Sequence, residues 1–447
     1  MRGITRLLAA FALTTLVFAA SCAPAATPPP ATQAPGSSQP TQAPPPPATA
    51  PEKVTLTVWY LGGGGPEATT VEEQVKIFAA AHPGVTIEFT LNDYQTMNEA
   101  IKLAMDSHTG PDVAYISPGY TSHLSLAKAG HLVELTDIIK ERGWDTRSSV
   151  EMINYFNTPT LPHIWGIPYD LAAVGVFYNK EIFARQGLEV PKTFGDFEAA
   201  LAKLKAAGIT PMSLAGADQW PIQQYWEALF EGNTPFEKLT CLEAMDRTCA
   251  WNIPTMVSSL EKLKEWVDKG YFNKDPLATN SADANSMFLK GDVAMVTTGT
   301  WVTPSFSTEA EFDAGFFPLP PMDPGLPWHV GGYTPNNVWV LPKYSTHQDL
   351  AIDLIDYMLG PEVASALWNI GDLVLYKFPE VPKPVYPLQA DAYISLQGLL
   401  PGYYLGSNQD QRVQALVWPL LQEVVGGKIT PQQALDKVQE EYLKYAK

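Results

Sequence analysis

Strand-like and helix-like patterns alternate from residue 54 to residue 116, and this order constrains the fold more than any other feature of the sequence. The patterns are strands over 54–60, 85–90 and 112–116 and helices over 69–81 and 94–107. This order predicts an α/β fold with a parallel sheet and right-handed crossovers. Ligands of open parallel sheets bind beyond the carboxyl ends of the strands. The loops after Tyr60 and Ile116 are therefore the first places to expect a binding site.

The N-terminus has the pattern of an export signal. Arg2 and Arg6 precede a mainly apolar run over residues 7–20, which is too short for a stable transmembrane helix but suits a signal peptide. Small residues then lead to Cys22, as in a bacterial lipobox, although Ala19 stands where leucine is usual. The sequence predicts a signal peptide over 1–21 and lipidation of Cys22. The alternative is an ordinary secretory signal in which Cys22 has no role.

A stiff tether is predicted over residues 22–52. Residues 23–51 carry no charge, no aromatic ring and no aliphatic side chain larger than alanine. Such a segment has nothing to bury, and its prolines favour extended polyproline-like structure. Fully extended, it could reach on the order of 80 Å. It would join a lipid to a globular domain, or serve as an O-glycosylated wall spacer in the same position.

Cysteine content suggests one disulfide. The chain has three cysteines, so lipidation of Cys22 would leave Cys241 and Cys249. In an oxidising compartment they could close a small loop and contribute roughly 2–3 kcal/mol to stability. Two free thiols are the alternative. A metal site is disfavoured because the spacing is unusual for zinc and no histidine lies nearby.

Composition limits the partners. The net charge of −18 makes nucleic acid and anionic lipid surfaces poor partners. The residues after position 52 suffice for two lobes with separate cores. Twelve tryptophans and nineteen tyrosines would supply both core and exposed ring faces suited to sugars.

Short motifs in the globular part resemble the family of bacterial extracellular solute-binding proteins that includes the maltose- and oligosaccharide-binding proteins of ABC transporters. The matching pieces follow the family's order and lie at 58–59, 78, 82–85, 110–113, 126–130, 132–136, 165–169, 177–180, 183, 191–194, 288–295, 299–301 and 427–435. Each piece is weak alone. The ordered set on a chain with a lipobox is specific.

The resemblance implies a periplasmic-binding-protein-like fold in which two α/β lobes are joined by hinge strands around a ligand cleft. Lobe 1 would hold 53–172 and 316–370, and lobe 2 would hold 173–315 and 371–447. It further implies a monomer that closes on a sugar or oligosaccharide and presents it to ABC permease subunits. The protein would act on the extracytoplasmic face of the cell membrane, without a cofactor or metal.

Candidate ligand-binding residues in the first half of the chain follow the strand ends and the expected hinge. Gly62 and Gly63 could let backbone N–H groups approach a ligand, or form a plain tight turn. Ser117 and Tyr120 lie in the loop beyond Ile116, whereas Asp112 is expected to cap a nearby loop. Two further candidates, which could instead be hinge packing contacts, are Tyr169 and Asp170.

Later candidates come mainly from the expected second lobe. Trp220 lies in a polar loop and could stack on a sugar face or belong to the lobe core. We expect Trp220 and Trp301 to lie on facing walls of the cleft. The remaining candidates are Thr300 beside Trp301, Gly332 and Tyr333 after a proline-rich return segment, and Tyr404 in a late loop.

An enzyme is the main alternative function. A lipid-anchored glycoside-processing enzyme would share the acidic composition, but it needs two carboxylates about 5–9 Å apart. The sequence has no recognisable glycosidase motif that contains such carboxylates. It also has no Gly-x-Ser-x-Gly nucleophile elbow and no His-Glu-x-x-His zinc-protease motif. An adhesin would favour repeats or β-sandwich patterning, and neither is present.

Anchoring through Cys22 is directly testable. Cys22→Ser removes the sulfur that would carry lipid, so the variant should leave the membrane fraction. Fractionation followed by a carbonate wash measures this, with the unmodified protein as control. A variant that stays in the washed membranes would contradict the lipoprotein interpretation.

Overall fold

The computed structural model describes residues 53–120, 122–157, 161–405 and 409–447, all within one compact unit that spans 51–447. The expected signal peptide, Cys22 and tether lie outside the described residues. Within the described ranges, none of the helices is long and apolar enough to cross a bilayer.

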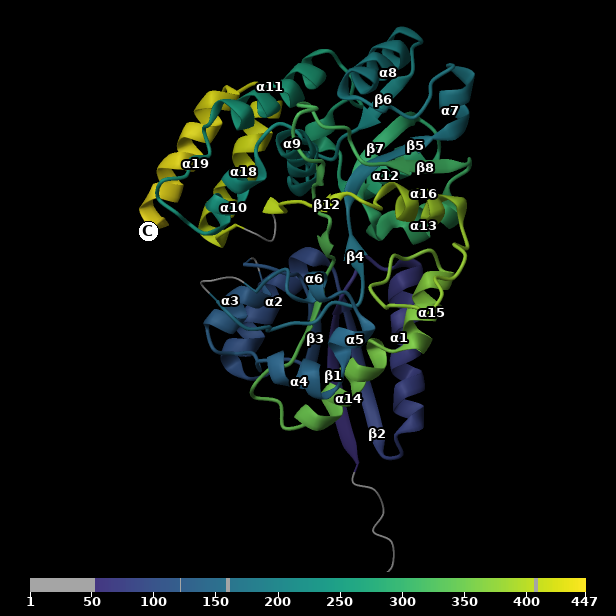
Figure 1. Cartoon of the computed structure of the whole chain (residues 1–447), viewed down its shortest axis with the longest axis vertical. Helices are drawn as coiled ribbons and strands as arrows, with labels where there is room; N and C mark the ends of the chain where they lie inside the picture. The colour runs from purple at the N-terminus through teal and green to yellow at the C-terminus, as the bar shows by residue number, and fades with distance from the viewer. Residues whose placement is uncertain (1–52, 121, 158–160, 406–408) are drawn as a thin grey trace, which may run out of the picture. The chain divides into compact units, whose positions relative to one another are not determined.

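The first sheet has the strand order β11-β3-β1-β2. Its members are β1 (Val54–Leu61), β2 (Val85–Asn92), β3 (Val113–Ile116) and β11 (Val338–Val340). β1 pairs in parallel with both β2 and β3, which confirms the parallel sheet predicted from the alternating pattern, and β11 adds an antiparallel edge. Figure 1 shows α1 (Gly65–Ala81) beside β2, with α14 (Gln348–Met358) and α15 (Pro361–Asn369) against α1.

The remaining helices between β2 and β4 are short, except α2. They are α2 (Tyr94–Ser107), α3 (His123–Lys128), α4 (Thr136–Glu141), α5 (Trp144–Arg147) and α6 (Val150–Ile153). Alternate residues of β1, Leu56, Val58 and Tyr60, are fully buried and pack with Val71 and Val75 of α1. Apolar residues at every second position of β1 and at helical spacing in α1 thus face each other and form one core.

The helix predicted to begin at Thr69 begins four residues earlier, at Gly65. Gly64 precedes it with a φ of 80°, a backbone conformation that glycine adopts without strain. Pro66 then occupies the first turn, where its missing N–H costs nothing. The Gly-Pro pair therefore starts the helix rather than forming a separate turn.

Asp112 has the structural role expected of it. Its Oδ2 accepts hydrogen bonds from the backbone N–H and the hydroxyl of Thr57, both at 2.9 Å, and its Oδ1 accepts from the hydroxyl of Ser345 at 2.7 Å. This carboxylate therefore ties β1 to the loop that follows β11.

The second sheet has the order β6-β7-β5-β8. Its strands are β5 (Val174–Asn179), β6 (Thr210–Ser213), β7 (Val293–Gly299) and β8 (Ala314–Phe317). β5 is antiparallel to both β7 and β8, whereas β6 is parallel to β7. Around this sheet and its own large core lie α7 (Lys180–Arg185), α8 (Phe194–Ala206), α9 (Trp220–Glu231), α10 (Phe236–Glu243), α11 (Pro254–Asp268), α12 (Ser281–Leu289), α13 (Thr303–Glu309), α16 (Pro387–Ser395), α18 (Gln411–Val425) and α19 (Pro431–Tyr445), with the 3₁₀ turns η1 (Pro276–Ala278) and η2 (Thr300–Val302).

Three stretches of chain connect the two sheets, and they lie side by side. β4 (Leu171–Ala172) leads into β5, β10 (Thr334–Pro335) leads back to β11, and residues 371–375 lead from α15 toward α16. β4 pairs with β10, and the N–H of Leu171 donates to the carbonyl of Leu373 at 3.0 Å. A second small ribbon pairs β9 (His329–Val330) with β12 (Leu400–Pro401).

The lobe boundaries expected from the sequence remain a proposal, with one detail to adjust. The expected boundary at residue 316 falls inside β8, all four of whose residues pair with β5. A boundary after Phe317 keeps that strand whole.

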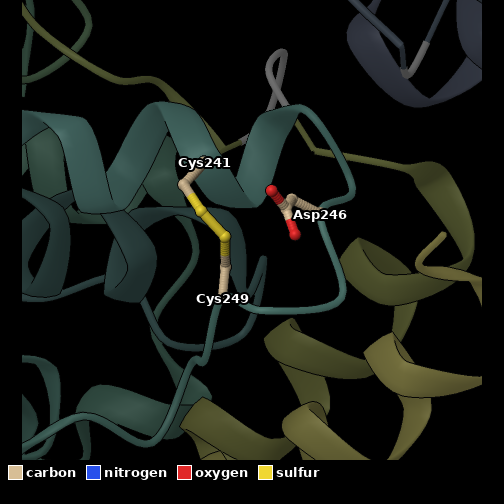
Figure 2. A group of neighbouring side chains, drawn as sticks. All are labelled: Cys241, Asp246 and Cys249. Atoms are coloured by element: carbon tan, nitrogen blue, oxygen red, sulfur yellow. A yellow bond between two sulfur atoms is a disulfide. The ribbon is translucent and has the colours of Figure 1, made fainter.

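Cys241 and Cys249 form a disulfide at the end of α10, with Cα atoms 6.1 Å apart (Figure 2). Asp246 lies in the loop between them, where its Oδ1 accepts from the N–H and hydroxyl of Thr248, both at 2.8 Å. The carbonyl of Asp246 accepts from the hydroxyl of Tyr442 at 2.8 Å, which fastens the loop to α19. The bonded sulfurs leave no thiolate here for a metal.

Loss of this disulfide should lower stability. Replacing both cysteines with alanine should reduce the free energy of unfolding by about 2–3 kcal/mol, because a small closed loop then opens in the unfolded chain. Urea unfolding with and without reductant measures the effect. Reductant should bring the wild type to the level of the variant and leave the variant unchanged; equal stability of the oxidised and reduced wild type would contradict it.

Candidate functional site

Two loops lie at the shared edge where the parallel strands β1 and β3 end. After β1, the N–H of Gly62 donates to the carbonyl of Asn92 at 3.0 Å, and a Cβ on Gly62 would lie 2.9 Å from the ring of Tyr60. A larger residue would therefore collide with that ring. Gly63 is exposed, and a Cβ there would meet no atom within 4 Å. Of these two candidates, only Gly63 faces open space.

The loop after β3 contributes Ser117 and Tyr120. Ser117 is buried, and its hydroxyl has no hydrogen-bond partner among the described residues. Tyr120 is half-buried, and its carbonyl accepts from the hydroxyl of Ser125. The N–H of Gly119 donates to Nδ1 of His123 at 2.7 Å, and burial lowers the pKa of His123 to about 3, so this ring is a neutral acceptor. The loop before α3 therefore holds two buried hydroxyls, those of Ser117 and Ser122, that have no hydrogen-bond partner among the described residues.

Tyr169 and Asp170 lie in the packing of the crossing segments rather than on an open surface. The Tyr169 ring stacks on Tyr115 with centroids 4.8 Å apart, and only 4% of the residue is exposed. Asp170 is fully buried and accepts hydrogen bonds from the hydroxyl of Tyr115 and, at 2.7 Å, from the side-chain amide of Asn336. The structure thus favours the packing role that the sequence left open for both residues.

Three residues near this pair were not selected from the sequence: Glu67, Asn336 and Asp372. The hydroxyl of Tyr169 donates to Oε1 of Glu67 at 3.1 Å, and the hydroxyl of Tyr60 lies 2.5 Å from the same oxygen. Burial raises the pKa of Glu67 and of Asp372, and the charge of Glu67 adds to the effect on Asp372. These three residues are far apart in the sequence and share no motif, so no local sequence pattern indicates that they lie together.

Trp220 and Trp301 lie against each other, not on facing walls as expected from the sequence. Their ring centroids are 6.3 Å apart in an edge-to-face arrangement, and both residues are half-buried. Trp220 begins α9 and Trp301 lies in η2 directly after β7, and α9 itself packs on β7. The facing-wall prediction was wrong because α9 packs on β7, so the residue that starts α9 lies beside the residue that follows β7.

Gly299 positions the Trp301 ring. A Cβ on Gly299 would lie only 2.0 Å from a ring carbon of Trp301. The adjacent Thr300 is buried, and its hydroxyl accepts from the N–H of Ala173 at 3.1 Å. Thr300 therefore fastens the end of β7 to the residue between β4 and β5, while Trp301 is only half-buried.

Gly332, Tyr333 and Tyr404 come from the two return segments. Gly332 has a φ of 62°, and a Cβ there would lie 3.5 Å from the Tyr404 ring and 2.8 Å from Val174. Tyr333 is half-buried, and burial raises its pKa. In the structure, Tyr404 therefore lies next to Gly332, and Trp220 lies next to Trp301.

Glu227 of α9 supports the segment that carries Tyr404. Its Oε1 accepts from the N–H of Leu405, and its Oε2 accepts weakly from the side-chain amide of Gln223 at 3.4 Å. Glu227 is fully buried, and this burial raises its pKa to about 8. Glu231, one turn further along α9, is also buried, and its pKa is raised by burial and by the charge of Glu227.

Several known proteins similar to this chain are named as binding proteins. A sequence model of the family described as bacterial extracellular solute-binding protein matches residues 63–365. An uncharacterized ABC transporter extracellular-binding protein of Pyrococcus horikoshii is 26% identical over 59% of this chain, and the match spans 59% of that relative. The sn-glycerol-3-phosphate-binding periplasmic protein of Escherichia coli is 25% identical over 86% of this chain and 90% of its own.

The fold is also shared with a solved structure. A chitin oligosaccharide binding protein superposes with a TM-score of 0.79 at 24% identity, over 88% of this chain and 99% of its own. The two-lobe α/β fold expected from the sequence is confirmed by this likeness.

Protonation of Glu227 predicts a pH dependence of stability. Between pH 4.5 and about 8 the folded protein holds a proton on Glu227 that the unfolded chain releases, so the free energy of unfolding falls as pH rises through this range. One such proton corresponds to about 1.4 kcal/mol per pH unit. Glu227→Gln stays neutral and should lose less stability between pH 5 and pH 8.

Urea unfolding at several pH values tests this dependence. Glu237→Gln, which changes an exposed residue of the neighbouring helix, is the matched control and should follow the wild type. Parallel pH profiles for wild type and Glu227→Gln would contradict the assignment.

Proposed function

This chain belongs to the family of bacterial extracellular solute-binding proteins, and we propose that it captures a sugar or oligosaccharide outside the cytoplasm and delivers it to the permease subunits of an ABC importer. The observation that carries the sugar assignment is the Trp220–Trp301 pair. Both rings are half-buried, so each keeps part of its apolar surface for a ligand. Sugar C–H faces pack well on such rings.

The position of the pair supports a role in capture. Trp301 lies two residues before α13, and a Cβ on Gly65 at the start of α1 would lie 3.2 Å from the hydroxyl of Ser305 in α13. The exposed loop of Gly63 and Gly64 therefore adjoins the helix that follows Trp301. A ligand at this junction would contact both the loop before α1 and the segment before α13. Contact with both lobes is what allows a ligand to stabilise a closed form.

A glycerol phosphate is the second candidate, because the relative from Escherichia coli is named for binding one. A phosphate favours a cationic clamp, usually arginine. The five arginines of the described ranges bond elsewhere: Arg142 with Asp353, Arg147 with Asp356, Arg185 with Glu181, Arg412 with Asp410, and Arg247 with the carbonyl of Ala446. None of these bonds involves a candidate site residue, so we favour a neutral sugar.

We propose binding without turnover. The family match and the similar proteins are binding proteins, which supports this choice over a glycoside-processing enzyme. The carboxyl groups of Asp170 and Asp372 are buried in the packing of the crossing segments, where a glycosidic bond has no access in the conformation described. Anchoring through Cys22, a monomeric state and an extracytoplasmic location on the cell membrane are parts of the same proposal.

Ligand titration of tryptophan variants tests the function. Isothermal titration of the wild type against mono-, di- and oligosaccharides and glycerol 3-phosphate should give binding to a sugar. Trp301→Ala and Trp220→Ala should weaken it roughly ten- to a hundredfold, since each loses apolar contact worth about 1–3 kcal/mol. Both variants should remain folded because the rings are only half-buried.

Trp165→Ala is the matched control. Trp165 is also half-buried but packs with the core beneath α2, so its loss should affect stability and leave sugar affinity unchanged. Binding of glycerol 3-phosphate alone would replace the sugar assignment. Steady hydrolysis of a glycoside, or normal sugar binding by both Trp220→Ala and Trp301→Ala, would overturn the proposal as stated.

A further inference from the structure

Three carboxyl groups from distant parts of the chain meet at the crossing segments. Glu67 lies in the first turn of α1, Asp170 directly precedes β4, and Asp372 follows α15. One carboxylate oxygen from each lies within 4.8 Å of the others. The group thus joins the first sheet to two of the three segments that connect the sheets.

Backbone contacts fix this group in place. Asp170 pairs with Val374 in an isolated antiparallel bridge, and the N–H of Leu171 donates to the carbonyl of Leu373 at 3.0 Å. Asp170 and Asp372 are therefore carried by adjacent paired segments. The proximity of their carboxyl groups follows from the backbone and does not depend on long flexible side chains.

The group has three carboxyl groups and no basic partner. No ion pair of the described residues includes Glu67, Asp170 or Asp372. Burial of carboxylates is costly unless a proton or a cation neutralises them. The arrangement therefore calls for one of these two partners.

The surrounding donors suit ionised carboxylates. Tyr169 donates to Oε1 of Glu67, and Asp170 accepts from Tyr115 at one oxygen and from Asn336 at the other. Donors of this kind stabilise the charged form of a carboxylate. Two of the three groups are thus built to accept hydrogen bonds rather than to donate them.

Asp372 has an oxygen left without a partner. Its Oδ1 accepts from the N–H of Leu373 at 2.8 Å, whereas its Oδ2 has no hydrogen-bond partner among the described residues. Only 3% of Asp372 is exposed, so bulk water does not supply the missing contact. A buried, unpaired carboxylate oxygen beside two other carboxylates is what a bound cation would satisfy.

We propose that Glu67, Asp170 and Asp372 bind one Ca²⁺. An oxygen-only set with several carboxylates suits this hard cation, and Ca²⁺–O distances of about 2.4 Å allow ligand oxygens up to about 4.8 Å apart. Water and phenol oxygens would complete the coordination. The bound ion joins α1 to the crossing segments and so stabilises the hinge region, whatever solute the cleft takes.

Terbium luminescence on the full mature chain tests the site. Tb³⁺ replaces Ca²⁺ at oxygen sites. The hydroxyls of Tyr60 and Tyr169 donate to Glu67 and that of Tyr115 donates to Asp170, so these rings are close enough to sensitise the emission. The wild type should show a saturable signal at one site that Ca²⁺ displaces, and CaCl₂ should raise the melting temperature at neutral pH. Mg²⁺ should compete less well because it demands shorter, near-octahedral coordination.

Asp372→Asn should weaken Ca²⁺ binding at least tenfold, because it removes one ligand charge but keeps the oxygen that accepts from Leu373. Asp283→Asn changes an exposed acidic residue of α12 and is the control for binding to surface carboxylates. Glu67→Gln provides a second variant should Asp372→Asn fold poorly. Equal Ca²⁺ affinity in wild type and the variant that folds would overturn the proposal. So would a melting temperature that responds to acid but not to Ca²⁺, which would show that protons alone neutralise the group.

Discussion

A stack of three phenol rings joins the first sheet to the segments that cross to the second. Tyr60 and Tyr115 are register partners on β1 and β3, and their ring centroids lie 4.9 Å apart. Tyr169, at the start of the first crossing, also stacks on Tyr115. The hydroxyl groups of Tyr60 and Tyr169 lie 2.6 Å apart, and those of Tyr115 and Tyr169 reach Asp170 and Glu67.

The stack matters because the polar ends of these rings have no water to bind. Their hydroxyl groups need protein acceptors, and carboxylates serve this purpose only if the chain brings them there. Glu67 comes from the first turn of α1, whose start is set by Gly64 and Pro66. The position of a glycine and a proline at the surface therefore determines whether the buried phenols of the hinge are satisfied.

Around the second sheet, small residues determine where aromatic rings can lie. Gly299 leaves space for Trp301, and Gly332 leaves space for Val174 beside the Tyr404 ring. Glu227 holds the N–H of Leu405, next to Tyr404, from within α9. Glycines at these positions leave room that a side chain would otherwise fill, and the neighbouring half-buried rings pack there. Rings held in place in this way give a preorganised surface for a solute.

The sequence alone determined the parallel order of β1, β2 and β3, the structural role of Asp112 and the family, because local periodicity and short ordered motifs carry that information. It identified Trp220, Trp301, Gly332 and Tyr404 as residues of interest but paired the tryptophans wrongly. Only the tertiary structure placed Trp220 beside Trp301, enclosed Tyr169 and Asp170, and brought Glu67, Asn336 and Asp372 to them. These contacts join residues far apart in the chain, and their partners are set by how the sheets and crossing segments pack, which no local pattern records.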